Sequence, residues 1–175
     1  MKKMSAKNMV NVAFAILVFG GLVVFATQNE SFGRALNILR PEVKVSISGS
    51  LQRDGQNLPL AKLETVKSGE ILNWNINSAN SGNASAQNYR VVGQIPPGTE
   101  LVKGSPTSDS NAEVKYSIDG GKTFTAVPQI DETQPDGSVK KVPAPVASYT
   151  QVQFGWAKEL AADSQANAAY RVRVK

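Results

Sequence analysis

Residues 66–105 read VKSGEILNWNINSANSGNASAQNYRVVGQIPPGTELVKGS, and polar and apolar side chains alternate in two parts of this stretch. In the first part Leu72, Trp74 and Ile76 are separated by asparagines, so one side of an extended strand would be apolar and the other rich in amides. Asparagine, serine and glycine then cluster in residues 79–84, where they favour a turn. The pattern predicts a strand with one buried face, followed by a turn.

The second alternating part predicts another strand. Tyr89, Val91 and Ile95 fall on one side of the chain. Residues 96–99 (PPGT) end the run, because proline cannot donate a ladder hydrogen bond and glycine accepts the turn conformation. We expect the next short strand to begin at residues 101–102. Strands and turns thus follow one another without any set of catalytic side chains.

The N-terminus has the composition of an export signal. Three lysines precede an apolar run at residues 9–26, which ends in small residues at the positions that a signal peptidase reads. We predict that residues 1–26 are a signal peptide cleaved after Ala26, or a hydrophobic signal anchor that is retained as a helix. Both outcomes place the rest of the chain outside the cytoplasm. Residues 27–41 are expected to form a connector.

Charge and composition exclude several classes of function. The 175 residues carry a net charge of +5, but without residues 1–26 the count falls to 16 basic and 14 acidic residues. No basic run is interleaved with aromatic residues, so we expect no nucleic-acid partner. Histidine and cysteine are both absent. This removes disulfides, thiolate nucleophiles, imidazole bases and the usual zinc sites, and we predict no enzyme activity, cofactor, metal or catalytic residue.

Further strands are expected on both sides of the opening stretch. Residues 42–48 alternate and predict the first strand, and residues 51–63 predict a hairpin that turns at Asp54-Gly55, with Pro59 at a sheet edge. Residues 114–118 predict a strand that turns at 119–122 into a second strand at 123–127. The last two strands are predicted at residues 150–156 and 168–174, each with its apolar side chains in one phase.

Residues 128–147 contain four prolines and show no period. We therefore predict a long exposed loop there. With eight or nine short strands and no helix beyond the leader, residues 42–175 are expected to form one all-β domain, an antiparallel β-sandwich. Trp74, Tyr89, Phe154 and Trp156 have the phase of core residues between its two sheets.

Residues 42–105 also resemble a known family, the conserved-repeat domain of unknown function that occurs in bacterial surface proteins. The resemblance implies an immunoglobulin-like sandwich, a place on an exported protein and no enzymatic activity, and it supplies no site residues. Such domains commonly occur in tandem, whereas this chain holds a single copy. The resemblance rests on Ser68-Gly69-Glu70, Asn80-Ser81-Gly82, the strand from Tyr89 to Gln94 and the sequence from Ile95 to Leu101.

We therefore expect an exported, non-catalytic, immunoglobulin-like module that makes structural or adhesive protein contacts in the bacterial envelope. Its partners would be envelope or surface proteins, or further copies of itself, and it would touch the membrane only through an uncleaved N-terminal segment. The expected location is the periplasm, cell surface or medium, with or without an inner-membrane anchor. Contacts are expected through a sheet edge or end loops, above all residues 128–147.

Two alternatives follow from other features. Residues 36–48 place a strand after a connector, which would suit a fibre assembled by strand donation between copies. Residues 117–124 (SIDGGKTF) resemble the Asp-box of sialidases, which would suit a glycan-binding or glycan-active protein, although in that motif the aspartate braces a turn. Asp131, Glu132 and Asp136 are the remaining acidic candidates for an acid-base pair or a calcium site.

Overall fold

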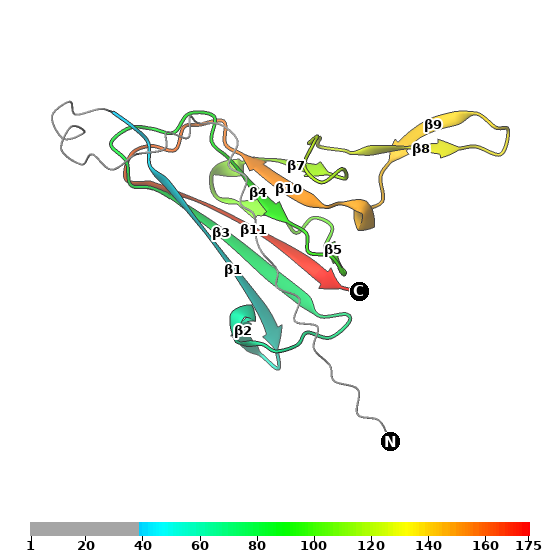
Figure 1. Ribbon diagram of the computed structural model, residues 1–175, viewed down its shortest axis with the longest axis horizontal. Helices are drawn as coiled ribbons and strands as arrows, with labels where there is room; N and C mark the ends of the chain where they lie inside the picture. Colours follow the sequence, from blue (N-terminus) through cyan, green and yellow to red (C-terminus); the bar gives the residue numbers. More distant parts are fainter. Residues whose placement is uncertain (1–38) are drawn as a thin grey trace, which may run out of the picture.

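The computed structural model describes residues 39–175, which form an all-β antiparallel domain of several sheets (Figure 1). The signal or anchor predicted for residues 1–26, and nearly all of the connector, lie outside the described residues. Within residues 39–175 the only helices are three single 3-10 turns, η1 (Leu60–Lys62), η2 (Asp109–Asn111) and η3 (Val146–Ser148). None of the helices in this part of the chain has the length and hydropathy to cross a membrane.

The larger sheet has the order β2-β1-β3-β11-β5, and β6 also pairs with β11. Its centre is the pair β3 and β11, which runs in register from Ile71–Arg173 to Asn80–Ser164. The strands are β1 (Val43–Arg53), β2 (Gln56–Pro59), β3 (Ile71–Asn80), β5 (Thr99–Leu101), β6 (Thr107–Ser108) and β11 (Ser164–Val174).

A second sheet has the order β4-β10-β7, and a third consists of β8 and β9 alone. The apolar sides of the two larger sheets meet in one core, and we call these two sheets the body. The strands are β4 (Arg90–Gln94), β7 (Glu113–Ser117), β8 (Gln129–Thr133), β9 (Val139–Pro143) and β10 (Gln151–Gly155).

The core confirms the phase expected for the apolar residues. Val152, Phe154 and Val172 are 0% exposed, and burial of each such side chain contributes about 1.5–3 kcal/mol. The aromatic rings of Tyr89 and Trp156 stack with their centroids 5.6 Å apart. The cluster comprises Leu51, Leu72, Trp74, Ile76, Ala86, Tyr89, Val91, Ile95, Leu101, Val152, Phe154, Trp156, Leu160, Ala166, Ala168, Tyr170 and Val172.

Tyr170 links the two sheets of the body. Its phenol crosses from β11 and donates a hydrogen bond of 2.5 Å to the carbonyl oxygen of Gln94 at the end of β4. Gly93 leaves the space for the ring, because a Cβ at this position would lie 2.4 Å from the Tyr170 Cε1 atom. Burial raises the pKa of the Tyr170 phenol far above its usual range, so it remains a hydrogen-bond donor.

Asn80 fixes the opposite end of the body. Its side chain is 1% exposed, and its Nδ2 group donates to the carbonyl oxygens of Ala84, Leu160 and Ala161 at 2.7–3.1 Å. Its Oδ1 atom accepts the backbone N–H of Glu42 at 3.0 Å and the backbone N–H of Gly82, in the turn after β3, at 3.2 Å. One amide thus joins the start of β1, the turn after β3 and the turn before β11.

Several predicted elements are confirmed with shifted ends. The hairpin expected at residues 51–63 turns at Asp54 and Gly55, whose φ angles are 50° and 77°, and Pro59 ends the edge strand β2. The first strand extends to Arg53 rather than ending near residue 48. The strand expected at residues 101–102 is β5, which begins earlier, at Thr99. The short strand β6 has no counterpart among the predicted strands.

The strand predicted for residues 123–127 is wrong. Only one bridge forms there, between Tyr116 of β7 and Thr125. The backbone N–H of Thr123 donates to the Asp119 carboxylate at 3.0 Å instead of to a neighbouring strand, and Pro128 soon follows with no N–H to offer. The turn is therefore present, but the second strand is not.

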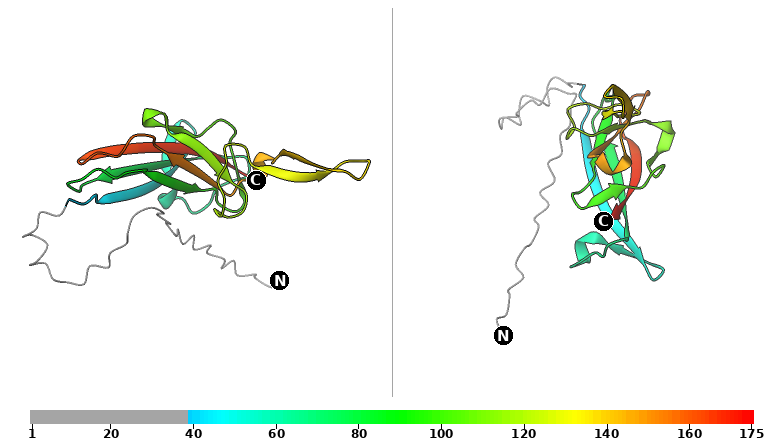
Figure 2. Two further views of the ribbon diagram at one scale, coloured as in Figure 1. Left: turned by 90° about the horizontal axis from the view of Figure 1, so that it is seen from above. Right: turned by 90° about the vertical axis from the view of Figure 1, so that its right-hand side faces the viewer.

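The prediction that residues 128–147 form a loop without secondary structure is also wrong. Gln129–Thr133 and Val139–Pro143 pair as β8 and β9, with Gly137 at φ 84° in the turn. We call residues 129–143 the arm, because both strands stand clear of the body (Figures 1 and 2). Every residue of β8 is exposed. The sequence of the arm does not alternate between polar and apolar residues, because neither of its faces is buried and nothing selects such a pattern.

Candidate binding surfaces

The outer face of the larger sheet carries an ordered array of small polar side chains. In the middle of β1 the residues that point away from the core are serines, between Lys44 and Gln52, and in the middle of β3 they are asparagines. The register places them in rows across the sheet. The rows are Ser46, Asn77 and Asn167; then Ser48, Asn75, Ala169 and Thr107; then Ser50, Asn73 and Arg171.

Two hollows lie over this array. The larger has a volume of about 600 Å³ and is bordered by Ser50, Asn73 and Arg171, by the segment around Ser105 and by Asn57 of β2. The smaller has a volume of about 230 Å³ and extends toward Asn77 and Asn167. Asn75, Thr107 and Ala169 line both hollows, so the two are continuous along the strands.

Ser105 shapes the wall of the larger hollow. Strand pairing with β11 is interrupted between β5 and β6. There the buried Ser105 hydroxyl replaces the missing backbone partner: it accepts the Arg171 N–H at 3.0 Å and donates to the Arg171 carbonyl at 3.2 Å. Gly104 precedes it at φ 71°, a conformation that favours glycine. The backbone of Arg171 is therefore held in place on this side.

The array is partly paired and partly open. Asn77 donates to Asn167 at 2.7 Å, and Asn167 donates in turn to the Asp109 carboxylate at 3.1 Å. By contrast, the side chains of Asn73 and Asn75 make no hydrogen bond within residues 39–175. Open amides therefore gather around the larger hollow.

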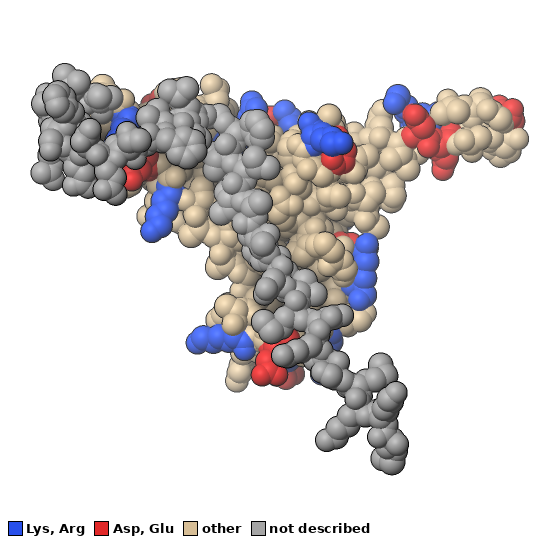
Figure 3. Space-filling view, viewed as in Figure 1, with Lys and Arg blue, Asp and Glu red and all other residues tan. Residues whose placement is uncertain are grey.

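Few charges border the two hollows. The charged lining residues are Arg171 and Asp109, and the Asp109 carboxylate is occupied by Asn167 and by the indole N–H of Trp156 at 3.3 Å. Arg171 is exposed, and its guanidinium makes no ion pair within the described residues. On the face shown in Figure 3, charged side chains lie along the rim of the body and on the arm, and the visible part of the middle is uncharged.

The arm is the second candidate surface. Its base is fixed, because the buried Ala144 donates its backbone N–H to the Pro128 carbonyl at 2.8 Å. Its tip is closed by a bond of 2.8 Å from the Gln134 N–H to the Ser138 carbonyl. Since bonded pairs alternate along an antiparallel ladder, Ile130 and Glu132 direct their backbone groups into the hairpin.

The outer edge of β8 is consequently open. The backbone groups of Gln129, Asp131 and Thr133 point away from β9 and have no strand partner within the described residues. The corresponding edge of β9 is interrupted by Pro143, which has no N–H to donate. An added strand would therefore find a complete set of donors and acceptors on β8 only.

The two strands of the arm carry opposite charges. Asp131 and Glu132 lie on β8, Lys140 and Lys141 lie on β9, and Asp131 forms a 3.3 Å ion pair with Lys141. Exposed aliphatic side chains accompany them: Ile130 is 37% exposed and Val139 is 66% exposed. The β8 edge is thus acidic and partly apolar.

The acidic candidates from the sequence do not converge. Asp131 and Glu132 are adjacent in an extended strand and point to opposite sides, and Glu132 accepts a bond of 3.1 Å from Gln134. Asp136 accepts the hydroxyl and the backbone N–H of Ser138 at 2.7 and 2.9 Å, and these bonds, the hydroxyl first, lower the pKa of its carboxyl. Within residues 39–175, acidic side chains form no cluster of three that could hold a metal ion.

The Asp-box residues brace a turn. The Asp119 carboxylate accepts the hydroxyls of Thr123 and Ser117 at 2.6 and 2.7 Å, and these bonds lower the pKa of Asp119 well below its usual range. Ser117 is 1% exposed and accepts the backbone N–H of Gly121 at 2.8 Å. The carboxylate is occupied by turn contacts and is not directed at a hollow.

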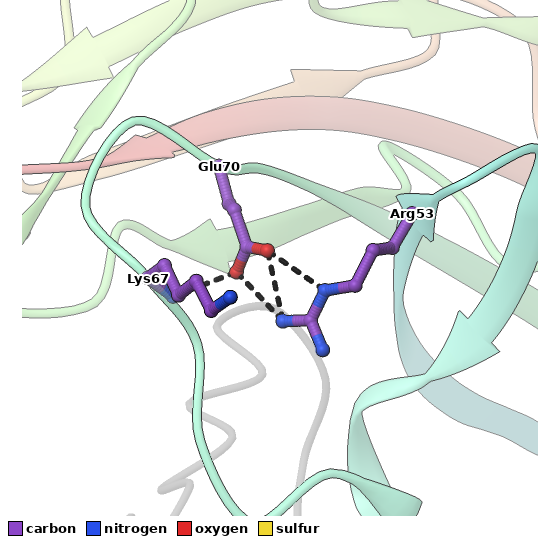
Figure 4. A network of polar contacts seen from close by, with 3 residues as sticks. All are labelled: Arg53, Lys67 and Glu70. Atoms are coloured by element: carbon purple, nitrogen blue, oxygen red, sulfur yellow. Dashed lines mark hydrogen bonds and ion pairs between the residues drawn. The ribbon is translucent and has the colours of Figure 1, made fainter.

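Glu70 has a similar structural role at the end of the body (Figure 4). Its carboxylate accepts two hydrogen bonds from the Arg53 guanidinium at 2.9 and 3.0 Å and the backbone N–H of Lys67 at 2.7 Å. The Lys67 bond is the largest cause, ahead of Arg53, of the lowered pKa of Glu70. This contact joins the end of β1 to the turn before β3.

In a fibre built by strand donation, β1 would be given to another copy, but here it is paired within its own chain. Val43 to Leu51 of β1 pair with β3 of the same chain. The preceding residues 36–38 lie outside the described part.

Comparison of the chain with models of known protein families, with curated proteins and with solved structures finds no match.

Proposed function

We propose that the chain is an exported, non-catalytic module that makes protein contacts in the bacterial envelope through the arm. One observation carries the proposal: the β8 strand presents an open, acidic edge that stands clear of the body (Figure 2). An open edge is a template for an extended segment of a partner. The expected partner segment is a strand that carries lysine or arginine, because it would face Asp131 and Glu132.

We also infer an immunoglobulin-like sandwich, related to the conserved-repeat domain of bacterial surface proteins. The support is two antiparallel sheets that share one core, with β4, β10 and β7 facing the larger sheet. Export is supported by the composition of residues 1–26. A non-catalytic role is supported by the absence of histidine and cysteine from the sequence, and by Asp119, whose carboxylate accepts hydrogen bonds from its own turn.

The arm is better suited to binding a partner than to stabilising the core. An isolated two-stranded hairpin is at best marginally stable in water, and here only its base is anchored in the body. Exposed valine and isoleucine side chains on such a hairpin remain in water unless something covers them. A partner strand along β8 would cover Ile130 and complete the ladder.

A crosslinking experiment in intact cells tests the proposal. A photoreactive residue replaces Thr133, whose backbone faces the open edge, and a control chain carries it at Lys158, an exposed position in the turn before β11. We expect an adduct from position 133, mapped by mass spectrometry to an extended basic segment of another envelope protein. Replacing Asp131 and Glu132 with lysine should reduce its yield at least about tenfold.

Two results would contradict the proposal. One is an equal yield of the same adducts from positions 133 and 158. The other is an adduct of the same partner, formed through the photoreactive residue at position 158, whose yield is unchanged when residues 129–143 are replaced by Asn-Gly, a pair suited to a two-residue hairpin turn between Pro128 and Ala144.

A further inference from the structure

We propose that the two hollows on the outer face of the larger sheet bind an oligosaccharide that carries a carboxylate group, with Arg171 as the partner of the carboxylate. This site lies on the strands β1, β3 and β11, and the inference does not depend on the function proposed for the arm.

The open amides and hydroxyls define the ligand class. An asparagine side chain offers two donors and an acceptor, and a serine hydroxyl can do either, so the array matches groups that both donate and accept. Asn73, Asn75, Ser48 and Ser50 present such groups without partners within residues 39–175. Sugar hydroxyls have this dual character, and a chain of sugars presents them repeatedly.

The face lacks what a protein partner normally uses. Protein interfaces are anchored by aromatic and other large apolar side chains. The exposed large apolar residues of the described chain are Leu39, Val66, Val127, Ile130 and Val139, and none of them lines either hollow. Trp74 and Tyr170 border the larger hollow from beneath, but they are 9% and 2% exposed and have the phase of the core.

The dimensions fit a small chain rather than a single group. The larger hollow, at about 600 Å³, lies within the usual range of about 300–1,000 Å³ for ligand sites. It continues into the smaller one past Ala169, whose short side chain leaves room between Asn167 and Arg171 on the same strand. An extended ligand could therefore lie along the strands.

Arg171 selects for an acidic substituent. Its guanidinium is unpaired within the described residues, while its backbone N–H and carbonyl are both hydrogen-bonded to the Ser105 hydroxyl. A guanidinium binds a carboxylate through two parallel hydrogen bonds. A single arginine does not make a site for nucleic acid, whose binding needs several phosphate contacts.

The experiment titrates the purified full chain with two hexasaccharide probes, oligogalacturonate and the neutral cellohexaose, and follows backbone amide signals by NMR. We expect the signals of Asn73, Asn75 and Ala169 to shift, with tighter binding of oligogalacturonate. Arg171→Gln should weaken that binding at least about tenfold, which is the loss expected for a charge-assisted hydrogen bond.

Arg173→Gln is the matched control. Arg173 is the next outward residue of β11, is exposed and lines neither hollow, so its replacement should leave both affinities unchanged. Ala169→Phe should abolish binding of both probes by filling the junction of the hollows. A well-dispersed amide spectrum of each variant shows that it has folded.

Three results would overturn the inference. The site is excluded if neither probe shifts the outer-face signals at about 10 mM, because ligands weaker than this have less than about 3 kcal/mol of binding energy. The acidic assignment is excluded if Arg171→Gln and Arg173→Gln bind oligogalacturonate equally. If the chain instead self-associates in sedimentation, and Ala169→Phe abolishes this, the occupant is a second copy.

Discussion

At the residue scale, Glu70 makes the body sensitive to acid. Its folded-state pKa lies below the ordinary 4.5, so its contribution to stability is complete above about pH 4.5 and is lost as the pH falls through the folded value. Glu70→Gln keeps the shape but removes the charge. We expect its melting temperature to lie below that of the native chain at pH 7 and to approach it in acid, as measured by thermal unfolding between pH 2 and pH 7.

Glu64→Gln is the control for this prediction. Glu64 is exposed and makes no hydrogen bond or ion pair with any described residue. Its replacement should leave the melting curve unchanged. A Glu70→Gln chain whose deficit is the same at pH 7 and in acid would show that the carboxylate charge is not the cause.

A pair of glycines tests how closely the two sheets approach. Gly93→Ala would place a Cβ 2.4 Å from Tyr170 Cε1, and overpacking of this kind costs about 1–3 kcal/mol. Gly155→Ala is matched, since a Cβ there would meet Arg90 Cγ at an ordinary 3.5 Å. We expect chemical denaturation to show destabilisation of the first variant and no loss in the second. Equal effects would mean that Tyr170 moves aside.

Sequence alone predicted which side of the central strand β3 is buried, because burial selects alternation at Leu72, Trp74 and Ile76. It did not predict the outer-face array. The asparagines of β3 were visible as an amide-rich face, but Ser48, Asn75 and Ala169 align only through a register that joins distant parts of the chain. Asn77 and Asn167, for example, lie 90 positions apart.

At the element scale, the alternating ladder of the arm makes adjacent positions respond differently to proline. The N–H of Thr133 points outward, so Thr133→Pro should leave the hairpin intact and block addition of a strand to β8. Glu132→Pro removes an inward N–H and should open the arm. Hydrogen exchange of the Lys140 and Val142 amides distinguishes the two: protection should persist in the first variant and be lost in the second.

Both variants should retain the melting temperature of the native chain, because the arm contributes no residue to the core between Gln129 and Pro143. Loss of protection in Thr133→Pro, together with retained protection in Glu132→Pro, would contradict the ladder described above.

The arm also shows why the sequence did not predict these two strands. With both faces in water, β8 and β9 had no reason to alternate, and the prolines at 128 and 143 resembled loop residues.

At the scale of the whole molecule, β11 holds the larger sheet together. It lies between β3 and β5 and supplies Ala168, Tyr170 and Val172 to the core. A chain that ends after Asp163 should therefore show no cooperative unfolding transition by circular dichroism, whereas the chain with the arm replaced by Asn-Gly should keep one. A cooperative transition in the shortened chain would show that the smaller sheet is stable without β11.

The order of the strands could not be predicted from the sequence. Turn signals such as Asp54-Gly55 report that two strands are neighbours, because the turn and its strands are local. The pairing of β3 with β11 has no such local signal, because the two strands are far apart in sequence and are brought together by the core that they share. The sequence therefore predicted the composition of the body better than its topology.

The positions of β1 and the arm determine how tension would pass through the molecule. The described chain enters β1 at one end of the body, and the arm projects from the other (Figure 1). A pull between Leu39 and the arm draws β1 lengthwise along β3, so the pairs from Val43 to Leu51 are loaded together rather than opened one after another. Single-molecule stretching through these points should need a higher rupture force than stretching through Leu39 and Asn80, which separates the same ladder from its end. An anchored copy whose arm is held by a partner would then resist shear in the surrounding medium.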